Sequence, residues 1–82
     1  MNSKKDYYID NLTKLGLTES EVKVYLSLLK GKTYTASEVA KLSGVLRSKI
    51  YDILNRLIQK GLCVEILGSV KKYSALNPET AF

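Results

Sequence analysis

The chain has no histidine, a single cysteine and a single proline among its 82 residues. Without a second cysteine, Cys63 has no partner for a disulfide within the chain, and without histidine the usual ligands of an intrachain zinc site are missing. We expect Cys63 to be a small buried apolar side chain of a strand. The sequence therefore predicts neither a metal site nor a cofactor.

The groups that catalytic sites use are also scarce. There is no histidine to act as a general base, no glycine-rich loop follows a strand to hold phosphate, and the acidic residues are scattered over exposed helical positions. Asp52 lies within one helical turn of Lys49 and of Arg56, so an ion pair or a phosphate-orienting role is favoured over general-base catalysis. We expect no enzyme activity.

Long apolar runs are absent. No stretch is long enough to cross a bilayer, and the lysine-containing amino terminus lacks the apolar core of a signal peptide, which predicts a cytoplasmic protein. There is no internal repeat, low-complexity segment or linker, so residues 1–82 are expected to form a single domain. A hydrophobic fraction of 45% supports a modest core and excludes a disordered chain.

Positive charge is in excess, with a formal net charge of +5 and a pI near 9.4. Between Lys41 and Tyr73, seven Lys and Arg residues stand against two acidic residues, so the excess is concentrated in one part of the chain. This distribution suggests an acidic partner such as nucleic acid. The alternative is an ordinary solvated, lysine-rich surface.

Apolar periodicity predicts two helices in the first part of the chain. The first covers residues 6–15 and is closed by Gly16 in a left-handed cap; its apolar residues are Tyr8, Ile9, Leu12 and Leu15. The second starts at Thr18, which has the spacing of a capping box with Glu21, and continues to Gly31. Its predicted buried stripe consists of Val22, Tyr25, Leu26 and Leu29.

A short β-prone stretch, Thr33-Tyr34-Thr35, follows and is suited to pairing with a later strand. Thr35 and Glu38 repeat the capping-box spacing, which predicts a third helix over residues 36–43. Its apolar residues are Val39, Ala40 and Leu42.

The tight turn Ser43-Gly44-Val45 then leads into a longer amphipathic helix, predicted from about Arg47 to Lys60. Its apolar side consists of Ile50, Ile53, Leu54, Leu57 and Ile58. Its other side is polar and also contains Gln59, and the candidates for DNA contact on it are Arg47, Ser48, Lys49, Tyr51, Asp52, Asn55 and Arg56. Two helices joined by a tight turn, the second bearing groups that reach phosphates and base edges, indicate a helix-turn-helix with a reading helix.

After Gly61 the apolar period changes to two, as Leu62, Val64 and Ile66 alternate with Cys63, Glu65 and Leu67. Gly68-Ser69 predicts a tight turn, and residues 70–75 a partner strand. A hairpin over residues 62–76 after a reading helix is typical of a winged helix-turn-helix, a mainly α fold with a small β wing. The candidates for DNA contact on the wing are Ser69, Lys71 and Lys72. The alternative is a plain solvated hairpin.

The tyrosines and the single proline complete the pattern. Tyr25 and Tyr73 lie on apolar stripes and are expected in the core, whereas Tyr51 lies on the polar side of the reading helix. Pro78 ends the second strand, and residues 77–82 predict the start of a further helix.

Three segments of the chain resemble one protein family. The chain is similar to the amino-terminal winged helix-turn-helix domain of the TrmB-type, sugar-responsive transcriptional regulators found mainly in archaea. The segments that carry this resemblance lie within residues 15–79 and are LGLTESEVKVYLSLL, SKIYDIL and KKYSALNPE. The resemblance implies binding of double-stranded DNA as a dimer. It also implies that the major groove receives the helix that contains Arg47, Ser48, Tyr51, Asn55 and Arg56.

The chain departs from the family pattern in two places. Leu46 stands where the family commonly has proline. Proline at this position only fixes the backbone angle φ for the start of the helix, so we expect its replacement to lower helix order without changing the fold. Full regulators of this type continue past the wing into a coiled-coil helix and an effector-binding domain, whereas this sequence ends at Phe82. An excised DNA-binding domain and a small relative without a sensor both fit.

The predicted function is sequence-specific binding of double-stranded DNA by a transcriptional regulator. The alternative is a winged helix that contacts protein, which would expose apolar groups instead of cations on its reading helix and wing. A homodimer is expected through the amino-terminal helix, helped by the segment through Phe82, and the apolar residues of that helix are Tyr7, Tyr8, Ile9 and Leu12. The alternative is that these residues cap the core of a monomer.

Overall fold

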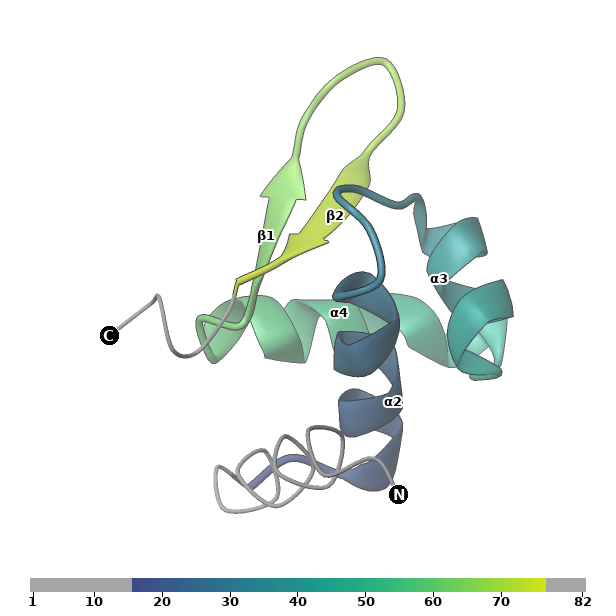
Figure 1. The fold of residues 1–82 in the computed structure, drawn as a ribbon, viewed down its shortest axis with the longest axis vertical. Helices are drawn as coiled ribbons and strands as arrows, with labels where there is room; N and C mark the ends of the chain where they lie inside the picture. The colour runs from purple at the N-terminus through teal and green to yellow at the C-terminus, as the bar shows by residue number, and fades with distance from the viewer. Residues whose placement is uncertain (1–15, 77–82) are drawn as a thin grey trace.

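The computed structural model describes residues 16–76. They form helices α2 (Glu19–Leu28), α3 (Ala36–Ser43) and α4 (Arg47–Gln59), followed by an antiparallel hairpin of β1 (Cys63–Ile66) and β2 (Lys72–Ala75). In Figure 1 the hairpin stands over α4, α2 crosses α4, and α3 lies beside one end of α4. This arrangement confirms the predicted winged helix-turn-helix.

Some predictions concern parts of the chain outside the described residues. These are the helix over residues 6–15, the segment 77–82, and the apolar residues expected at the dimer interface, namely Tyr7, Tyr8, Ile9, Leu12 and Phe82. Within the described part, no helix has the length and apolar character needed to span a membrane.

Capping boxes start α2 and α3, as predicted. The Thr18 hydroxyl accepts a hydrogen bond from the Glu21 amide at 3.2 Å, and the Glu21 carboxylate accepts one from the Thr18 amide at 2.9 Å. Thr35 and Glu38 form the same pair of bonds, at 3.2 and 2.8 Å. Each box pairs two amides that the start of a helix otherwise leaves unpaired. Local sequence therefore sets where both helices begin.

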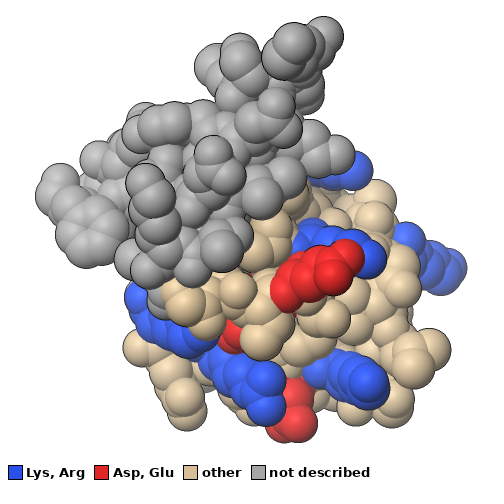
Figure 2. All heavy atoms as spheres, turned by 90° about the horizontal axis from the view of Figure 1, so that it is seen from below, with Lys and Arg blue, Asp and Glu red and all other residues tan. Residues whose placement is uncertain are grey.

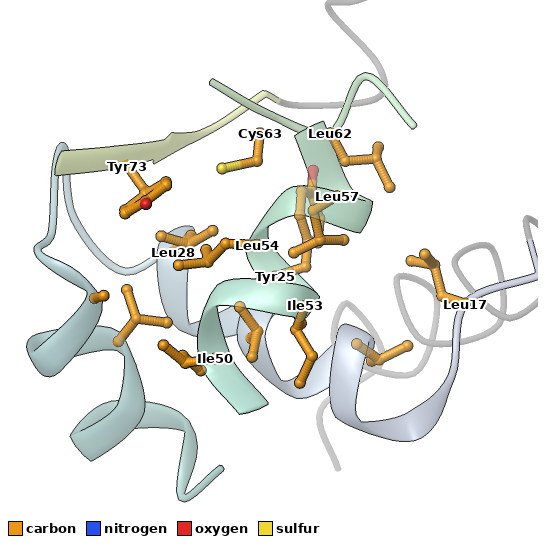
Figure 3. Packing of buried hydrophobic residues seen from close by; sticks show 14 residues of the cluster. Leu17, Tyr25, Leu28, Ile50, Ile53, Leu54, Leu57, Leu62, Cys63 and Tyr73 are labelled. Carbon is orange, nitrogen blue, oxygen red and sulfur yellow. The ribbon is translucent and has the colours of Figure 1, made fainter. Parts of the chain in front are cut away.

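The core lies between the helices and the inner face of the hairpin (Figure 3). The predicted apolar side of α4 supplies Ile50, Ile53, Leu54 and Leu57, all buried, while Ile58 is partly buried. Tyr25 and Tyr73 are buried as predicted, and so is Cys63. The Tyr25 hydroxyl donates a hydrogen bond to the Leu76 carbonyl at 2.6 Å. This bond ties α2 to the residue that follows the wing.

The predicted buried stripe of α2 is confirmed at Val22 and Tyr25 but wrong at Leu29. The buried residues at spacings of three, four and seven are Glu21, Val24, Tyr25 and Leu28, and Val22 and Ser27 beside them are also buried. Leu29, expected in the stripe, follows the last helical residue and is 37% exposed, and Leu26 is only partly buried. An acidic residue at the start of the buried row conceals the true register in the sequence.

The prediction for α3 needs a similar correction at Leu42, which is 44% exposed. Val39 is buried, and the row continues at helical spacing from Ala36 through Val39 and Ala40 to Ser43. Leu42 lies about 100° away from that row, because it directly precedes Ser43. α3 then ends at Gly44, whose φ of 74° is left-handed and makes the turn into α4.

The tight turn predicted at Gly68-Ser69 does not form. Ile66 pairs with Lys72, so residues 67–71 make a five-residue connection, and β2 starts at Lys72 rather than at Val70. Two-residue hairpin turns need a residue with positive φ, and Gly68 is not one of the glycines that adopt it. The predicted pairing of residues 33–35 does form, because Tyr34 and Tyr73 exchange two backbone hydrogen bonds of 2.9 and 2.7 Å.

Candidate nucleic-acid interface

The polar side of α4 is exposed along its length. Every residue predicted there for DNA contact is exposed, namely Arg47, Ser48, Lys49, Tyr51, Asp52, Asn55 and Arg56. The helix itself runs from Arg47 to Gln59, and Lys60 caps its carboxyl end. Because the apolar side is held against the core, the direction of the exposed side is fixed.

The exposed side chains of α4 form three rows, given 100° of rotation per residue and the position of the buried side. The middle row, opposite the core, consists of Ser48, Asp52, Asn55 and Gln59. The two flanking rows consist of Arg47 with Tyr51, and of Lys49 with Arg56. Neutral and acidic hydrogen-bonding groups are thus bordered by cations on both sides.

The cations of these flanking rows carry unneutralised charge. Within residues 16–76 the ion pairs are Lys23–Glu19, Lys60–Glu21 and Lys71–Glu65. The cations of α4 that take part in none of these pairs are Arg47, Lys49 and Arg56. Figure 2 shows one face of the molecule, on which separate Lys and Arg side chains outnumber the acidic ones. Unpaired cations along one exposed helix suit an anionic partner.

Of the two roles expected for Asp52, an ion pair or the orientation of a phosphate, the ion pair is not formed within residues 16–76. All three side chains concerned, those of Asp52, Lys49 and Arg56, are exposed. Exposed pairs of this kind contribute little energy, because water screens the charges and ordering two long side chains costs entropy. The Asp52 carboxylate therefore stays accessible in the middle row.

The positions and ion pairing of the wing lysines differ from the prediction. Ser69, Lys71 and Lys72 are all exposed, but Lys72 lies within β2 rather than at the tip. Lys71 Nζ lies 3.7 Å from the Glu65 carboxylate across the hairpin. Lys72 is therefore the one of these two lysines that has no ion pair among the described residues.

The tip of the wing is more apolar than expected. The exposed apolar side chains of the hairpin are Val64, Ile66, Leu67 and Val70, and Leu67, at 77%, is the most exposed. Sequence reasoning missed this surface, although one signal was present. Leu67 and Val70 directly flank Gly68-Ser69, and the tip of a hairpin has no core to cover such residues.

Lys60 anchors the carboxyl end of α4. Its Nζ lies 3.3 Å from the Glu21 carboxylate and 3.5 Å from the Gly16 carbonyl. Burial by itself raises the pKa of Glu21, but the hydrogen bonds from Thr18 and from Lys60 outweigh it, so the pKa lies below its ordinary value. The ionised carboxylate thus joins the start of α2 to the end of the reading helix. The sequence separation of 39 residues hid this pair from sequence reasoning.

The thiol of Cys63 offers no reactive site, since burial raises its pKa to about 11. Residues 16–76 contain no cluster of three or more His, Cys, Asp or Glu side chains placed to hold a metal ion. The exposed side of α4 and the wing are therefore the surfaces that remain to be explained.

Comparison with known proteins agrees with this geometry. Residues 12–79 match the family described as sugar-specific transcriptional regulator TrmB. The chain is 39% identical over 71 residues to the HTH-type sugar sensing transcriptional regulator TrmBL1 of Pyrococcus furiosus, covering 87% of this chain and 21% of that protein. It is 42% identical over 69 residues to the protein YrhO of Bacillus subtilis, covering 84% of this chain and 25% of that protein.

A similar solved structure is that of TrmBL2, described as an archaeal chromatin protein with a novel mode of DNA binding. It superposes with a TM-score of 0.78 and 29% identity, covering 92% of this chain and 30% of that one. The chain spans only 21% and 25% of the length of the two relatives compared above. The relatives whose names state a role are transcriptional regulators, not enzymes. Fold, sequence match and relatives agree that this chain belongs to the TrmB family of transcriptional regulators.

Proposed function

We propose that this chain is a DNA-binding domain of a transcriptional regulator and that it binds double-stranded DNA with α4 in the major groove. The observation that carries the proposal is the arrangement of α4, in which Arg47, Lys49 and Arg56, without ion pairs among residues 16–76, border an exposed polar row. The major groove has phosphates along both walls and base edges on its floor. The flanking cations match the walls, and the middle row matches the floor.

This placement assigns a role to each row. The side-chain amide of Asn55 in the middle row suits two hydrogen bonds with N6 and N7 of adenine. The Asp52 carboxylate suits a hydrogen bond donated by the amino group of cytosine. Ser48, at the amino-terminal end of the row, donates to or accepts from either kind of edge. Arg47, Lys49 and Arg56 hold phosphates and fix the register, as does the hydroxyl of Tyr51.

The wing is proposed to contact the DNA backbone beside the reading helix. Lys72 supplies the charge for this contact, and Ser69 at the tip supplies a hydroxyl. Lys71 contributes less, because Glu65 already neutralises part of its charge. The wing therefore adds affinity without selecting a sequence.

We propose that the chain forms a homodimer, because a single reading helix is rarely sufficient for sequence-specific binding. One helix covers only a few base pairs, whereas two related by a twofold axis read half-sites about 34 Å apart. We propose that residues 6–15, with their apolar side chains, form the contact between the subunits.

A second candidate function rests on the wing. Its exposed apolar residues, Val64, Ile66, Leu67 and Val70, are the feature expected of a winged helix that contacts protein. The reading helix does not share that feature, because its exposed side is charged. We therefore propose protein contact by the wing only as an addition to DNA binding by α4.

The experiment that tests the proposed function is binding selection on random duplexes with the intact chain, followed by fluorescence anisotropy on a recovered duplex and a scrambled one. Asn55→Ala is expected to reduce the preference for the recovered duplex by about 1 to 3 kcal/mol, since it removes a base contact. Arg56→Ala is expected to weaken both duplexes about equally, since it removes a phosphate contact.

Lys30→Ala is the matched control for charge, because Lys30 is exposed but follows α2 and lies outside α4 and the hairpin. It is expected to change binding to both duplexes less than Arg56→Ala does. Retention of full sequence preference by Asn55→Ala would show that the middle row does not read bases.

A further inference from the structure

Leu46, the residue before the first turn of α4, has a side chain that the fold does not use. It is 66% exposed, and as the N-cap of α4 it makes no side-chain cap hydrogen bond. The equivalent residues of α2 and α3 are Thr18 and Thr35, and both complete capping boxes. Leucine is among the poorest N-caps. Neither core packing nor helix capping therefore explains an exposed leucine here.

The charge around Leu46 indicates what kind of partner it meets. Arg47 and Lys49 follow it in the first turn of α4, which has no acidic residue, whereas the first turns of α2 and α3 both contain glutamate. Lysine is depleted from the apolar centres of protein contacts. An exposed leucine next to two cations that form no ion pair within the described part of the chain instead matches a partner that presents an apolar group between negative charges.

The major groove of DNA has that chemistry. The 5-methyl of thymine is the apolar group that its base edges display, and phosphates border it on both sides. Reading helices contact base edges with their amino-terminal residues, and Leu46 lies at that end of α4. We propose that Leu46 is a specificity-determining residue that contacts the 5-methyl group of a thymine in the half-site. This inference rests on the proposed DNA-binding function and names a base that the start of α4 selects.

The test uses the intact chain and a duplex recovered by binding selection. Each thymine is replaced, one at a time, by deoxyuridine, which pairs as thymine does but lacks the methyl group. Burial of one methyl group corresponds to about a fourfold change in affinity. The unaltered protein is therefore expected to bind about fourfold more weakly when the contacted thymine is replaced. Leu46→Ala is expected to bind the unmodified duplex more weakly and to be insensitive to that replacement.

Leu67→Ala is the matched control, because it is the same truncation at an exposed leucine of the wing tip. It is expected to keep the fourfold loss at the contacted thymine. The inference is overturned if no single deoxyuridine weakens binding of the unaltered protein, or if Leu46→Ala keeps the full loss. Either result leaves duplex binding in place, whereas failure of the unaltered chain to bind any duplex contradicts the proposed function as well.

Discussion

Glu21 is an acidic side chain in the buried row of α2 that takes part in two structural contacts at once. It closes the capping box with Thr18 and receives Lys60 from the end of α4. A buried carboxylate is tolerated only when such partners replace the water that it loses. The ionised carboxylate therefore adds a charged contact between the start of α2 and the end of α4, beside the apolar core that packs the two helices together.

Glu21→Gln is expected to lower the free energy of unfolding at pH 7 by about 1 to 3 kcal/mol, because it removes the charge from the acceptor of two partly buried contacts. The folded protein holds the pKa of Glu21 below its unfolded value. Its contribution is therefore present above the unfolded pKa and is lost as pH falls below about 4. Urea unfolding between pH 7 and pH 3 is expected to show a smaller loss of stability in the variant than in the unaltered chain.

The control for this prediction is Glu19→Gln on the same helix, where the carboxylate is exposed and its one ion pair among the described residues is with exposed Lys23. Its stability is expected to change by less than about 0.5 kcal/mol. Some acid sensitivity remains in the Glu21 variant, since hydrogen bonds from Thr35 also lower the pKa of Glu38. Identical pH profiles for Glu21→Gln and the unaltered chain would contradict the assigned role.

The hairpin carries its lysines in two different electrostatic settings. Lys71 pairs with Glu65 at 3.7 Å, whereas Lys72 lies in β2 without an ion pair among residues 16–76 and acts only through space on Glu38, whose pKa it helps to lower. Lys72→Ala is therefore expected to weaken the recovered and scrambled duplexes equally and to lower the salt slope by about 1. Lys71→Ala is expected to have a smaller effect, and Glu65→Gln to strengthen binding, because it frees Lys71.

Fluorescence anisotropy on both duplexes measures these effects. Tyr25→Phe serves as a control for indirect changes, because it removes the hydrogen bond to Leu76 that holds the end of the hairpin without altering charge. The assignment fails if Lys71→Ala weakens binding more than Lys72→Ala does.

Elements whose signals are local could be predicted from the sequence, and those that depend on distant contacts could not. Capping boxes at Thr18 and Thr35 place two helix starts, and the apolar row of α4 gives the face that packs on the core. The buried row of α2 could be predicted only in part: Val22 and Tyr25 follow from apolar periodicity, whereas the burial of Glu21 involves Lys60, which lies 39 residues away. The length of the wing connection likewise depends on the register between β1 and β2.

The candidate site shows the same division. The exposure of Arg47, Asn55 and Arg56 follows from helical periodicity alone. The pairing of Lys71 with Glu65 requires the cross-strand geometry of the hairpin. The exposure of Leu46 requires knowledge of where the core ends, because an apolar residue beside a helix start is equally consistent with burial.

The proposed dimer contact lies in residues 6–15, so the oligomeric state is tested on the intact chain. We predict that the intact chain is a dimer and that a version starting at Gly16 is a folded monomer, because residues 6–15 are proposed to form the contact. Light scattering over a range of protein concentrations measures the mass of both, and circular dichroism establishes that the shorter version is folded. A monomer at high concentration in both cases, or a dimer in both, contradicts this contact.

The salt dependence of duplex binding tests the DNA-binding account most directly. The three cations of α4 and Lys72 of the wing, which have no ion pair among residues 16–76, predict about four neutralised phosphates per subunit, each contributing about 0.9 to the slope of log K against log salt. A fluorescence-anisotropy titration of the intact chain at several salt concentrations is therefore expected to show a steep linear fall in affinity. Affinity that does not change with salt would contradict the account.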